Sequence, residues 1–510
     1  MEDEFDSEAP AFIDMNSEDV VEVNVDDTDN VEPMDEETEN DDENQGMDVD
    51  TDPKSAKPLP PDQSFYCINS HNDSVYAVSI DIATDNSQDG MYIQVASGGG
   101  DDKAFLTSLQ RSTQQINDNE INVNSLNLSE STPTKTHKDT VSSVAFNTKA
   151  LSGANQQKML AVGSYDGSIQ IWNLSSTNNE LLTTLEGPTD IEWLSWHPKG
   201  GTVLLAGSTD GTVWMYHAPT SKCMQVFVGH EGDVTCGTFT NDGKFAVTAS
   251  IDGTMRIWAP RTGLSRHVFR FDGESSGFEG DMNAAGSGES AITCMNCRSV
   301  QNSNGNASSL ILCGSENGYA YVCHVGTKKV LAALRHGEED HSNAPASNDG
   351  DDDEAFEKDF RSVEAVGFYN GPNHNDLHNW CATAGVNGLL KVWDLGNNGQ
   401  CRQVCSHIVT NDDDVNENTD NNESGITSLQ WHPTLPLIFT ATTDGIVRLW
   451  DARTGHCLLT LTGGYSDIIN DMDVYFDPNN DKNVIVATAS DDGKIRLFQV
   501  DVDKALNATQ

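Results

Sequence analysis

A short pattern of small, polar and apolar positions recurs along the chain and predicts repeated pairs of antiparallel strands. In each copy, small residues lead to Asp-Gly or Asn-Gly, and an alternating stretch ends in an apolar residue six positions after the Asp or Asn. Asp-Gly and Asn-Gly favour the tight turn of a β-hairpin, and the alternation places one face of the strand in a core. The seven clear copies run from Asp166 to Trp172, Asp210 to Tyr216, Asp252 to Trp258, Asn317 to Cys323, Asn387 to Trp393, Asp444 to Trp450 and Asp492 to Phe498, and a degenerate eighth copy spans 98–105.

An apolar stretch precedes each copy and sets the expected number of repeats. Eight such stretches occur, and each four-stranded blade needs one inner strand, so the chain is predicted to be an all-β, eight-bladed β-propeller. We expect the inner strands at 75–78, 141–144, 191–194, 234–237, 292–295, 363–366, 426–429 and 469–472.

The two ends of the repeat region are expected to meet and close the ring. Residues 64–68 are strand-like but have no blade of their own, so we assign them to the outer edge of the last blade, which leaves no open sheet edge there. The predicted division is a disordered acidic tail at 1–62, the propeller at 63–502 and a polar C-terminal tail at 503–510. Loop insertions are expected at 272–290, 338–359 and 411–423.

Negative charge is concentrated in segments that the repeat pattern leaves out. The 510-residue chain has a formal net charge of -51, and residues 1–53 hold 23 acidic side chains and no Lys or Arg. The stretches 338–359 and 412–423 add ten and six acids. Such blocks repel and stay solvated, so they serve solubility or attract a basic partner, and the sequence leaves both open. Direct nucleic-acid binding is not expected, because a phosphate backbone requires Lys and Arg.

Cysteine usage and hydropathy predict a reduced, intracellular protein. The chain has an odd number of cysteines, 11, and no apolar signal region follows its acidic start. We expect a cytoplasmic location, with the nucleus as a second one, and no membrane span, since no run of 18 apolar residues occurs. Cys294 and Cys297 fall in a predicted strand, where they point to opposite faces, so no metal site and no cofactor is expected.

The repeat pattern resembles that of WD-repeat proteins, in which a His, a strand Ser or Thr, the turn Asp and a Trp form a hydrogen-bonded set within a blade. This resemblance implies one set at His230, Asp252 and Trp258, and another at His137, Ser164, Asp166 and Trp172. A His-Asp-Ser grouping could also suggest a hydrolase triad, but its recurrence indicates a scaffold, and no enzyme activity is expected. The structural blade residues are therefore His137, Asp166, Trp172, Asp210, His230, Asp252, Trp258, Trp393, Asp444 and Trp450.

Three strings of sequence narrow the resemblance. The strings at 99–105, 191–198 and 205–214 resemble the WD-repeat family of angio-associated migratory cell protein and its fungal relatives, the dedicated ribosomal-protein chaperones. The resemblance covers essentially residues 1–500. It implies a monomeric, non-catalytic chaperone that escorts a basic large-subunit ribosomal protein, of the L-ten type, into the 60S subunit. The alternatives are a general interaction scaffold, such as a signalling or ubiquitin-ligase adaptor, and a histone chaperone.

A binding face is predicted where the inner strands begin. The residue after the first apolar position of each inner strand should reach the mouth of the central channel, and the residue before each turn should rim the same face. Three of these neighbourhoods are acidic and none is basic, which would focus negative potential on a basic client. Tyrosines there could stack on Arg or Lys. The alternative is that these are ordinary solvated loop carboxylates. The predicted partner-binding residues are Glu192, Glu364, Asp471, Tyr76, Tyr165, Glu316 and Asp491.

Overall fold

The structure is a computed structural model in which part of the chain is described. The propeller belongs to a compact unit that comprises Pro58–Gln510. The acidic tail and most of each predicted insertion lie outside the described residues. The described residues are 61–84, 91–111, 121–127, 137–147, 157–174, 179–271, 290–301, 307–337, 362–371, 377–407, 424–464, 467–477 and 480–508.

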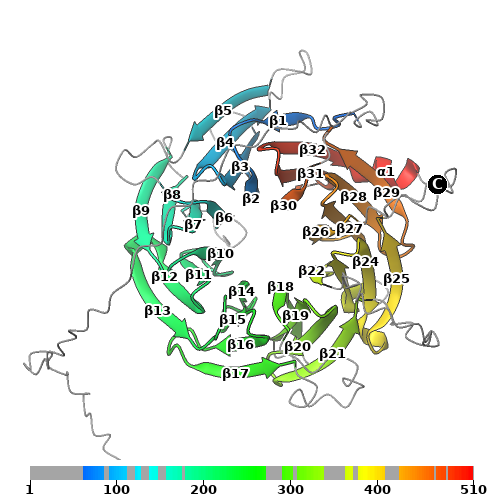
Figure 1. The fold of residues 1–510 in the computed structure, drawn as a ribbon. Helices are drawn as coiled ribbons and strands as arrows, with labels where there is room; N and C mark the ends of the chain where they lie inside the picture. The colour runs from blue at the N-terminus through cyan, green and yellow to red at the C-terminus, as the bar shows by residue number, and fades with distance from the viewer. Residues whose placement is uncertain are drawn as a thin grey trace, which may run out of the picture. The chain divides into compact units, whose positions relative to one another are not determined.

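The described residues form eight four-stranded antiparallel sheets, which are arranged as the blades of a ring (Figure 1). The predicted all-β, eight-bladed propeller is therefore confirmed. Blades I to IV are β2 (Val75–Thr84), β3 (Met91–Gly99), β4 (Ala104–Arg111) and β5 (Ile121–Asn127); β6 (Val141–Phe146), β7 (Met159–Ser164), β8 (Ser168–Asn173) and β9 (Glu180–Glu186); β10 (Ile191–Trp196), β11 (Val203–Ser208), β12 (Thr212–His217) and β13 (Lys222–Val228); β14 (Cys236–Phe239), β15 (Ala246–Ala249), β16 (Thr254–Trp258) and β17 (Ser265–Arg270).

The second half of the ring repeats this order. Blades V to VIII are β18 (Ile292–Gln301), β19 (Ala307–Ser315), β20 (Tyr319–His324) and β21 (Lys329–Arg335); β22 (Val363–Phe368), β23 (Trp380–Gly385), β24 (Leu389–Asp394) and β25 (Gln400–Ser406); β26 (Ile426–Trp431), β27 (Leu437–Thr442), β28 (Ile446–Asp451) and β29 (Cys457–Thr462); β30 (Ile469–Asp477), β31 (Asn480–Ser490), β32 (Ile495–Asp501) and β1 (Tyr66–Ile68). Short 3-10 turns lie at Ala218–Thr220, Leu377–Asn379 and Leu395–Asn397.

The ring is closed by its first strand. β1 lies within the range 64–68 and pairs antiparallel with β32, so the outer strand of blade VIII comes from the start of the propeller. An isolated bridge between Asp62 and Gly463 extends this junction. Residues 503–508 of the expected polar C-terminal tail belong to a short helix, α1 (Val502–Ala508), which buries Val502 and Ala505.

A glycine allows the backbone conformation of the tight turn between the second and third strands in seven of the eight blades. In the seven clear copies the glycine after the turn Asp or Asn has φ between 67° and 81°, a left-handed conformation that favours glycine. The degenerate eighth copy has Asp102 at this place, with φ of 60°. Asp is one of the few residues other than glycine that tolerate this left-handed backbone conformation. Seven of the eight inner strands begin at the predicted residue, and the eighth, β14, begins at Cys236, later than the predicted 234.

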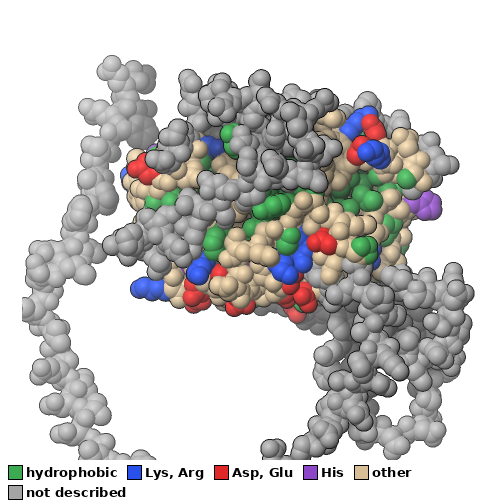
Figure 2. Space-filling view, turned by 90° about the horizontal axis from the view of Figure 1, so that it is seen from above, with side chains coloured by type: hydrophobic (Ala, Val, Ile, Leu, Met, Phe, Trp, Pro, Cys, Tyr) green, Lys and Arg blue, Asp and Glu red, His purple; other side chains and the backbone are tan. Residues whose placement is uncertain are grey.

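The hydrophobic core lies between neighbouring blades. One cluster joins Ala96 and Leu106 of blade I to Val144, Leu160 and Trp172 of blade II. The ring thus needs every blade, because each one buries its faces against two neighbours. Seen from its side, the described wall shows apolar side chains among polar ones, and charged side chains lie along the lower edge and also near the upper edge (Figure 2). No described helix is long and apolar enough to cross a membrane.

Candidate functional site

The register of the sheets brings the inner-strand starts and the turns together at one face. Val141 at the start of β6 pairs with Ser164 at the end of β7, just before the turn. Tyr165 donates its backbone N–H to the carbonyl of Thr140, and Glu316 and Asp491 make the same bond on blades V and VIII. We call this the turn face, and it holds the predicted rim residues Tyr165, Glu316 and Asp491.

A β-bulge lies at the second residue of seven inner strands. The register skips this residue on every blade except blade IV, where the strand begins later. A bulged residue is released from the strand ladder, so its side chain can be aimed away from the sheet. The second positions, with their counterpart on blade IV, are Tyr76, Ser142, Glu192, Thr235, Thr293, Glu364, Thr427 and Asn470.

Five of these eight side chains form a hydrogen-bonded girdle around the ring. Each donates to the carbonyl of the first inner-strand residue of the next blade. Thr235 Oγ1 lies 2.6 Å from the oxygen of Ile292, and Thr427 Oγ1 lies 2.7 Å from that of Ile469. The other three bonds join Ser142 to Ile191, Thr293 to Val363, and Asn470 to Val75. The girdle residues therefore hold blades together.

The remaining three second positions, Tyr76, Glu192 and Glu364, are not part of the girdle. An ionised glutamate has no proton to donate to a carbonyl. On blade III the indole N–H of Trp193 makes the link to the next blade in place of Glu192, and it donates to the carbonyl of Val234 at 2.8 Å. All three departures are residues predicted to bind a partner. The structure thus separates eight equivalent positions into five that link blades and three with other side-chain chemistry.

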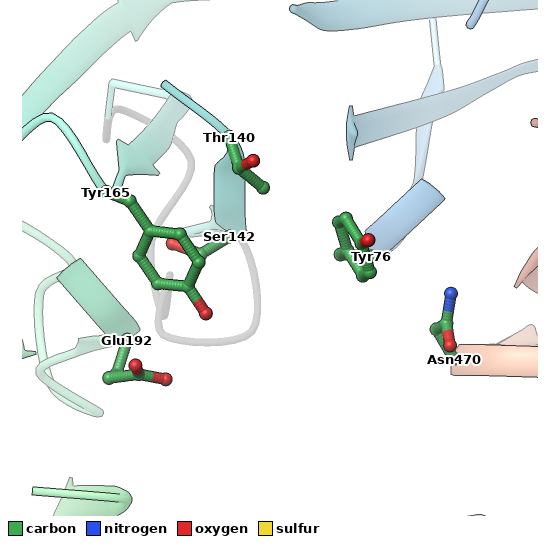
Figure 3. Close-up of a pocket in the computed structure, with 6 residues that line it drawn as sticks. All are labelled: Tyr76, Thr140, Ser142, Tyr165, Glu192 and Asn470. Carbon is green, nitrogen blue, oxygen red and sulfur yellow. The ribbon is translucent and has the colours of Figure 1, made fainter. Parts of the chain in front are cut away.

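Tyr76 and Glu192 lie in one hollow with Tyr165. The hollow measures about 530 Å³ and is also lined by Thr140, Ser142 and Asn470. Tyr165, Ser142 and Glu192 lie on one side of it, and Tyr76 and Asn470 on the other (Figure 3). Tyr76 is 45% exposed, which leaves much of its ring available for contact.

The electrostatics of the hollow are negative. Burial raises the pKa of Glu192, and the nearby carboxylates of Asp233 and Asp190 raise it further. Burial also raises the pKa of the Tyr165 hydroxyl, together with the charge of Glu192. Burial disfavours a charge of either sign, whereas the contributions of the neighbouring carboxylates show that the potential in the hollow is negative, which favours a cation. No second position or pre-turn position on the turn face holds Lys or Arg.

The other predicted binding residues do not line this hollow. The carboxylate of Asp471 lies between blades VIII and I. It accepts hydrogen bonds from the backbone N–H of Val78 at 2.9 Å and from that of Met472 at 2.8 Å. Asp491 accepts a hydrogen bond from the Asn470 amide at 2.7 Å. The half-buried Glu364 accepts one from the hydroxyl of Ser362 at 2.6 Å. Glu316 is exposed at the rim of blade V.

The structural set of blade IV is present in full. His230 lies 3.0 Å from Asp252 through Nδ1 and 2.8 Å from the hydroxyl of Thr248 through Nε2, and Trp258 donates its indole N–H to the same hydroxyl at 2.8 Å. Burial raises the pKa of Asp252, but the hydrogen bonds from His230, Thr254 and the Glu231 amide together outweigh burial and hold the pKa well below its usual range.

Blade II departs from the expected set. His137 lies 3.0 Å from the Ser168 hydroxyl and 3.7 Å from Asp166, but its Nε2 has no hydrogen-bond partner. Ser164 instead donates to a backbone carbonyl and caps the turn. Trp172 therefore donates to Gln170, at 3.2 Å. The physical reason is that Val162 occupies the strand position of Thr248 and offers no hydroxyl, so the predicted role of Ser164 in the set is wrong.

The sequence predicts Trp393, Asp444 and Trp450 as structural residues but does not assign their histidines. It also misses a grouping on blade I, where His71 lies 2.8 Å from Asp101 and 2.9 Å from the hydroxyl of Ser97. On blade VI, His336 lies 2.7 Å from Thr383 and 3.2 Å from Asn387, and Trp393 donates to Thr383 at 2.9 Å. On blade VII, Thr440 receives the indole N–H of Trp450 at 2.9 Å and lies 3.1 Å from His407. The available signal was a His after each outer strand, paired with a Thr four residues before the turn.

On blade III the turn carboxylate makes only local contacts. Asp210 accepts bonds from the backbone and hydroxyl of Thr212, at 2.8 and 2.6 Å, within its own turn. Within the described ranges no group of three or more His, Cys, Asp or Glu residues could hold a metal ion.

The chain was compared with known proteins. A family model described as WD domain, G-beta repeat, matches residues 129–173, 179–217, 221–259, 416–451 and 455–499. Angio-associated migratory cell protein from Homo sapiens is 30% identical over 440 residues, which cover 86% of this chain and 81% of that protein. Sqt1 from Saccharomyces cerevisiae has a similar crystal structure, with a TM-score of 0.62 and 19% identity over 86% of this chain and 99% of that one.

A second solved structure is a complex. Sqt1 from Chaetomium thermophilum, bound to the N-terminus of the ribosomal protein L10, matches with a TM-score of 0.58 and 15% identity over 86% of this chain and all of that one. At these identities the structural likeness establishes a shared fold and no more.

Proposed function

Since the chain belongs to the WD-repeat family of angio-associated migratory cell protein, we propose that it is a dedicated chaperone that escorts a basic large-subunit ribosomal protein. The client would bind at the turn face, in the hollow of Tyr76, Tyr165 and Glu192. Propellers of this family are typically non-catalytic scaffolds that bind other proteins. The proposal places this escort in the cytoplasm, with the nucleus as its second location.

One observation carries the proposal. The only second positions that leave the girdle, among those described, are two carboxylates and a tyrosine. Burial raises the pKa of one of these carboxylates, Glu192, and two neighbouring acids raise it further. A Lys or Arg side chain entering this hollow would relieve that repulsion and could stack on the exposed ring of Tyr76. A neutral or acidic peptide would gain neither contribution.

One other observation supports a ribosomal client over other basic proteins. The fold is shared with a protein whose crystal structure contains the N-terminus of ribosomal protein L10. The net charge of -51 suits any strongly basic client and does not distinguish a ribosomal protein from a histone. A histone chaperone or a general adaptor remains the alternative function, and each would show a different client preference.

The test is a binding measurement with three ligands. Isothermal titration would compare an N-terminal peptide of L10, a basic histone-tail peptide of equal charge and a neutral peptide of equal length. We expect saturable binding of the L10 peptide at least tenfold tighter than that of the histone peptide. Equal affinities would favour a charge-driven histone or general binder, and preference for the neutral peptide would overturn the proposal.

A matched pair of variants locates the site. Glu192→Lys with Glu364→Lys should leave the melting temperature unchanged. The double variant should bind the L10 peptide at least tenfold more weakly, which is about 1.4 kcal/mol. Asp351→Lys with Asp352→Lys makes the same change of charge in the 338–359 segment and should matter much less. Equal losses in the two variants would mean that bulk charge holds the client.

A further inference from the structure

Blade IV carries two arginines whose side chains have no acidic partner. Arg256, on β16, and Arg270, at the end of β17, line a second hollow of about 280 Å³. Its other lining residues are Glu231, Gly232, Ile251, Asp252 and Thr254. Within the described part of the chain neither side chain makes an ion pair or a hydrogen bond, and the Nε atom of Arg256 is buried without a partner. In a chain of net charge -51, two unpaired guanidinium groups in one hollow are unexpected.

Equivalent arginines on other blades are paired. Arg448 and Arg496 also stand four residues after a turn Asp, as Arg256 does. Arg448 lies 3.4 Å from Asp444, and Arg496 lies 2.6 Å from Asp492. Pairing with the turn carboxylate is thus available at this position of the fold, and Arg256 does not use it.

The reason is that the turn carboxylate of blade IV is already occupied. Asp252 is bonded to His230 at 3.0 Å and to the backbone of Glu231 at 3.0 Å. Arg256 instead rests against its own blade, with its guanidinium 6.0 Å from the ring centre of Trp258. A buried donor that lacks an acceptor is costly, and the cost disappears when a ligand supplies one.

The hollow has the composition of a small peptide-anion site. Each guanidinium offers five N–H donors, in a planar fork that matches a carboxylate or a phosphate. Ile251 is 44% exposed and offers apolar contact beside the charges. Two carboxylates line the same hollow and oppose an anion. Asp252 is held by His230 and by the backbone of Glu231, and the Glu231 side chain pairs with neither arginine among the described contacts.

We propose that Arg256 and Arg270 form a binding site for an acidic peptide, which presents a carboxylate or phosphate group to both guanidinium groups. This site lies on blade IV and is separate from the hollow of Tyr76 and Glu192 on blades I to III. The propeller thus offers an acidic surface to a basic ligand and a basic surface to an acidic one.

The experiment measures fluorescence anisotropy with three labelled peptides of one sequence. The variable positions carry phosphoserine, glutamate or glutamine, and the full-length protein is titrated into each. We expect saturable binding of the phosphoserine peptide, the glutamate peptide or both, and none of the glutamine peptide. The preferred anion identifies whether the ligand is a phosphorylated or an acidic segment.

Three variants test the residues. Arg256→Gln with Arg270→Gln should weaken binding at least tenfold. Arg261→Gln with Arg266→Gln makes the same charge change at the opposite end of blade IV and should alter the affinity less than twofold. Glu231→Gln should tighten binding, because it removes one opposing charge. Melting temperatures verify that each variant is folded.

The outcomes are clear in sign. Equal weakening by both arginine pairs, weaker binding by Glu231→Gln, or no saturable binding of either anionic peptide would overturn the site. The Arg256→Gln and Arg270→Gln variant should still bind the L10 peptide, so this inference can fail while the proposed chaperone function holds, and the reverse.

Discussion

At the scale of single residues, one hydroxyl organises blade IV. The indole N–H of Trp258 donates a hydrogen bond to the hydroxyl of Thr248. That hydroxyl can in turn donate to Nε2 of His230, and the Nδ1–H of His230 can donate to Asp252. This direction requires a neutral histidine with its proton on Nδ1. Every polar group of the set is satisfied, so these buried residues fix the turn to the strands.

The first prediction concerns the carboxylate at the end of this chain. Asp252→Ala leaves His230 and the amide of Glu231 without their acceptor, and we expect a loss of about 1–3 kcal/mol in the free energy of unfolding. Asp210→Ala is the control, because Asp210 is exposed and bonds only within its turn, so it should lose less. Denaturant unfolding measures both. A larger loss for Asp210→Ala would contradict the assignment.

Sequence reasoning finds such sets only where the spacing is short and the motif complete. His230 and Asp252 are 22 residues apart and were identified, whereas His336 and Asn387 are 51 apart and were not. The intervening chain between the second pair includes the acidic stretch 338–359, which hides the repeat. Ser164 was misassigned because a Ser near the turn resembles the strand hydroxyl in composition but differs from it in register.

At the scale of elements, the inner strands combine two tasks at one position. The bulge aims the second side chain of seven inner strands away from the sheet, and the girdle uses four of these side chains, with Thr235 of blade IV, to link neighbouring blades. The sequence predicted the starts of seven of these eight strands, because apolar residues mark them. It could not predict the girdle, because the hydrogen bonds depend on the distance between blades, which no local pattern encodes.

The second prediction is that a substitution at one of these second positions raises stability and weakens client binding. Glu364→Thr places a hydroxyl where Thr293 and Thr427 bond the next blade, so it should complete the link to the carbonyl of Ile426. We expect a gain of about 0.5–1.5 kcal/mol in unfolding free energy, with weaker binding of the basic client. Thermal melting and titration measure the two effects. Glu364→Val is the control, because valine is similar in size to threonine but has no hydroxyl to donate, and it should not show the gain in stability.

The third prediction concerns the strand that closes the ring. Deleting residues 1–55 should leave the melting temperature almost unchanged, since this segment is acidic and has little apolar surface to bury. Deleting residues 1–70 removes β1 and exposes the edge of β32, so stability should collapse. Calorimetry of the two truncated proteins compares them. Similar melting temperatures would show that closure by β1 contributes little.

At the scale of the whole molecule, charge and fold are encoded separately. The repeats predict eight blades without reference to charge, and the excess acid lies largely in segments between or before them. The binding face needed the structure, since Tyr76, Tyr165 and Glu192 come from three blades and meet only in the closed ring. The arginine pair of blade IV shows that local charge can oppose the net charge.

The last prediction follows from this separation. A strongly negative chain should accelerate the encounter with a basic client by roughly 10- to 1,000-fold at low salt. The Debye length is only about 8 Å at physiological ionic strength, so salt screens the distant acids and spares contacts inside the hollow. Stopped-flow measurements should therefore show an association rate that falls steeply with salt and a dissociation rate that changes less. Glu192→Gln should mainly raise the dissociation rate, because this residue would touch the client, whereas Asp351→Asn with Asp352→Asn should mainly lower the association rate. An association rate independent of salt would mean that the acidic segments serve solubility and do not attract the client.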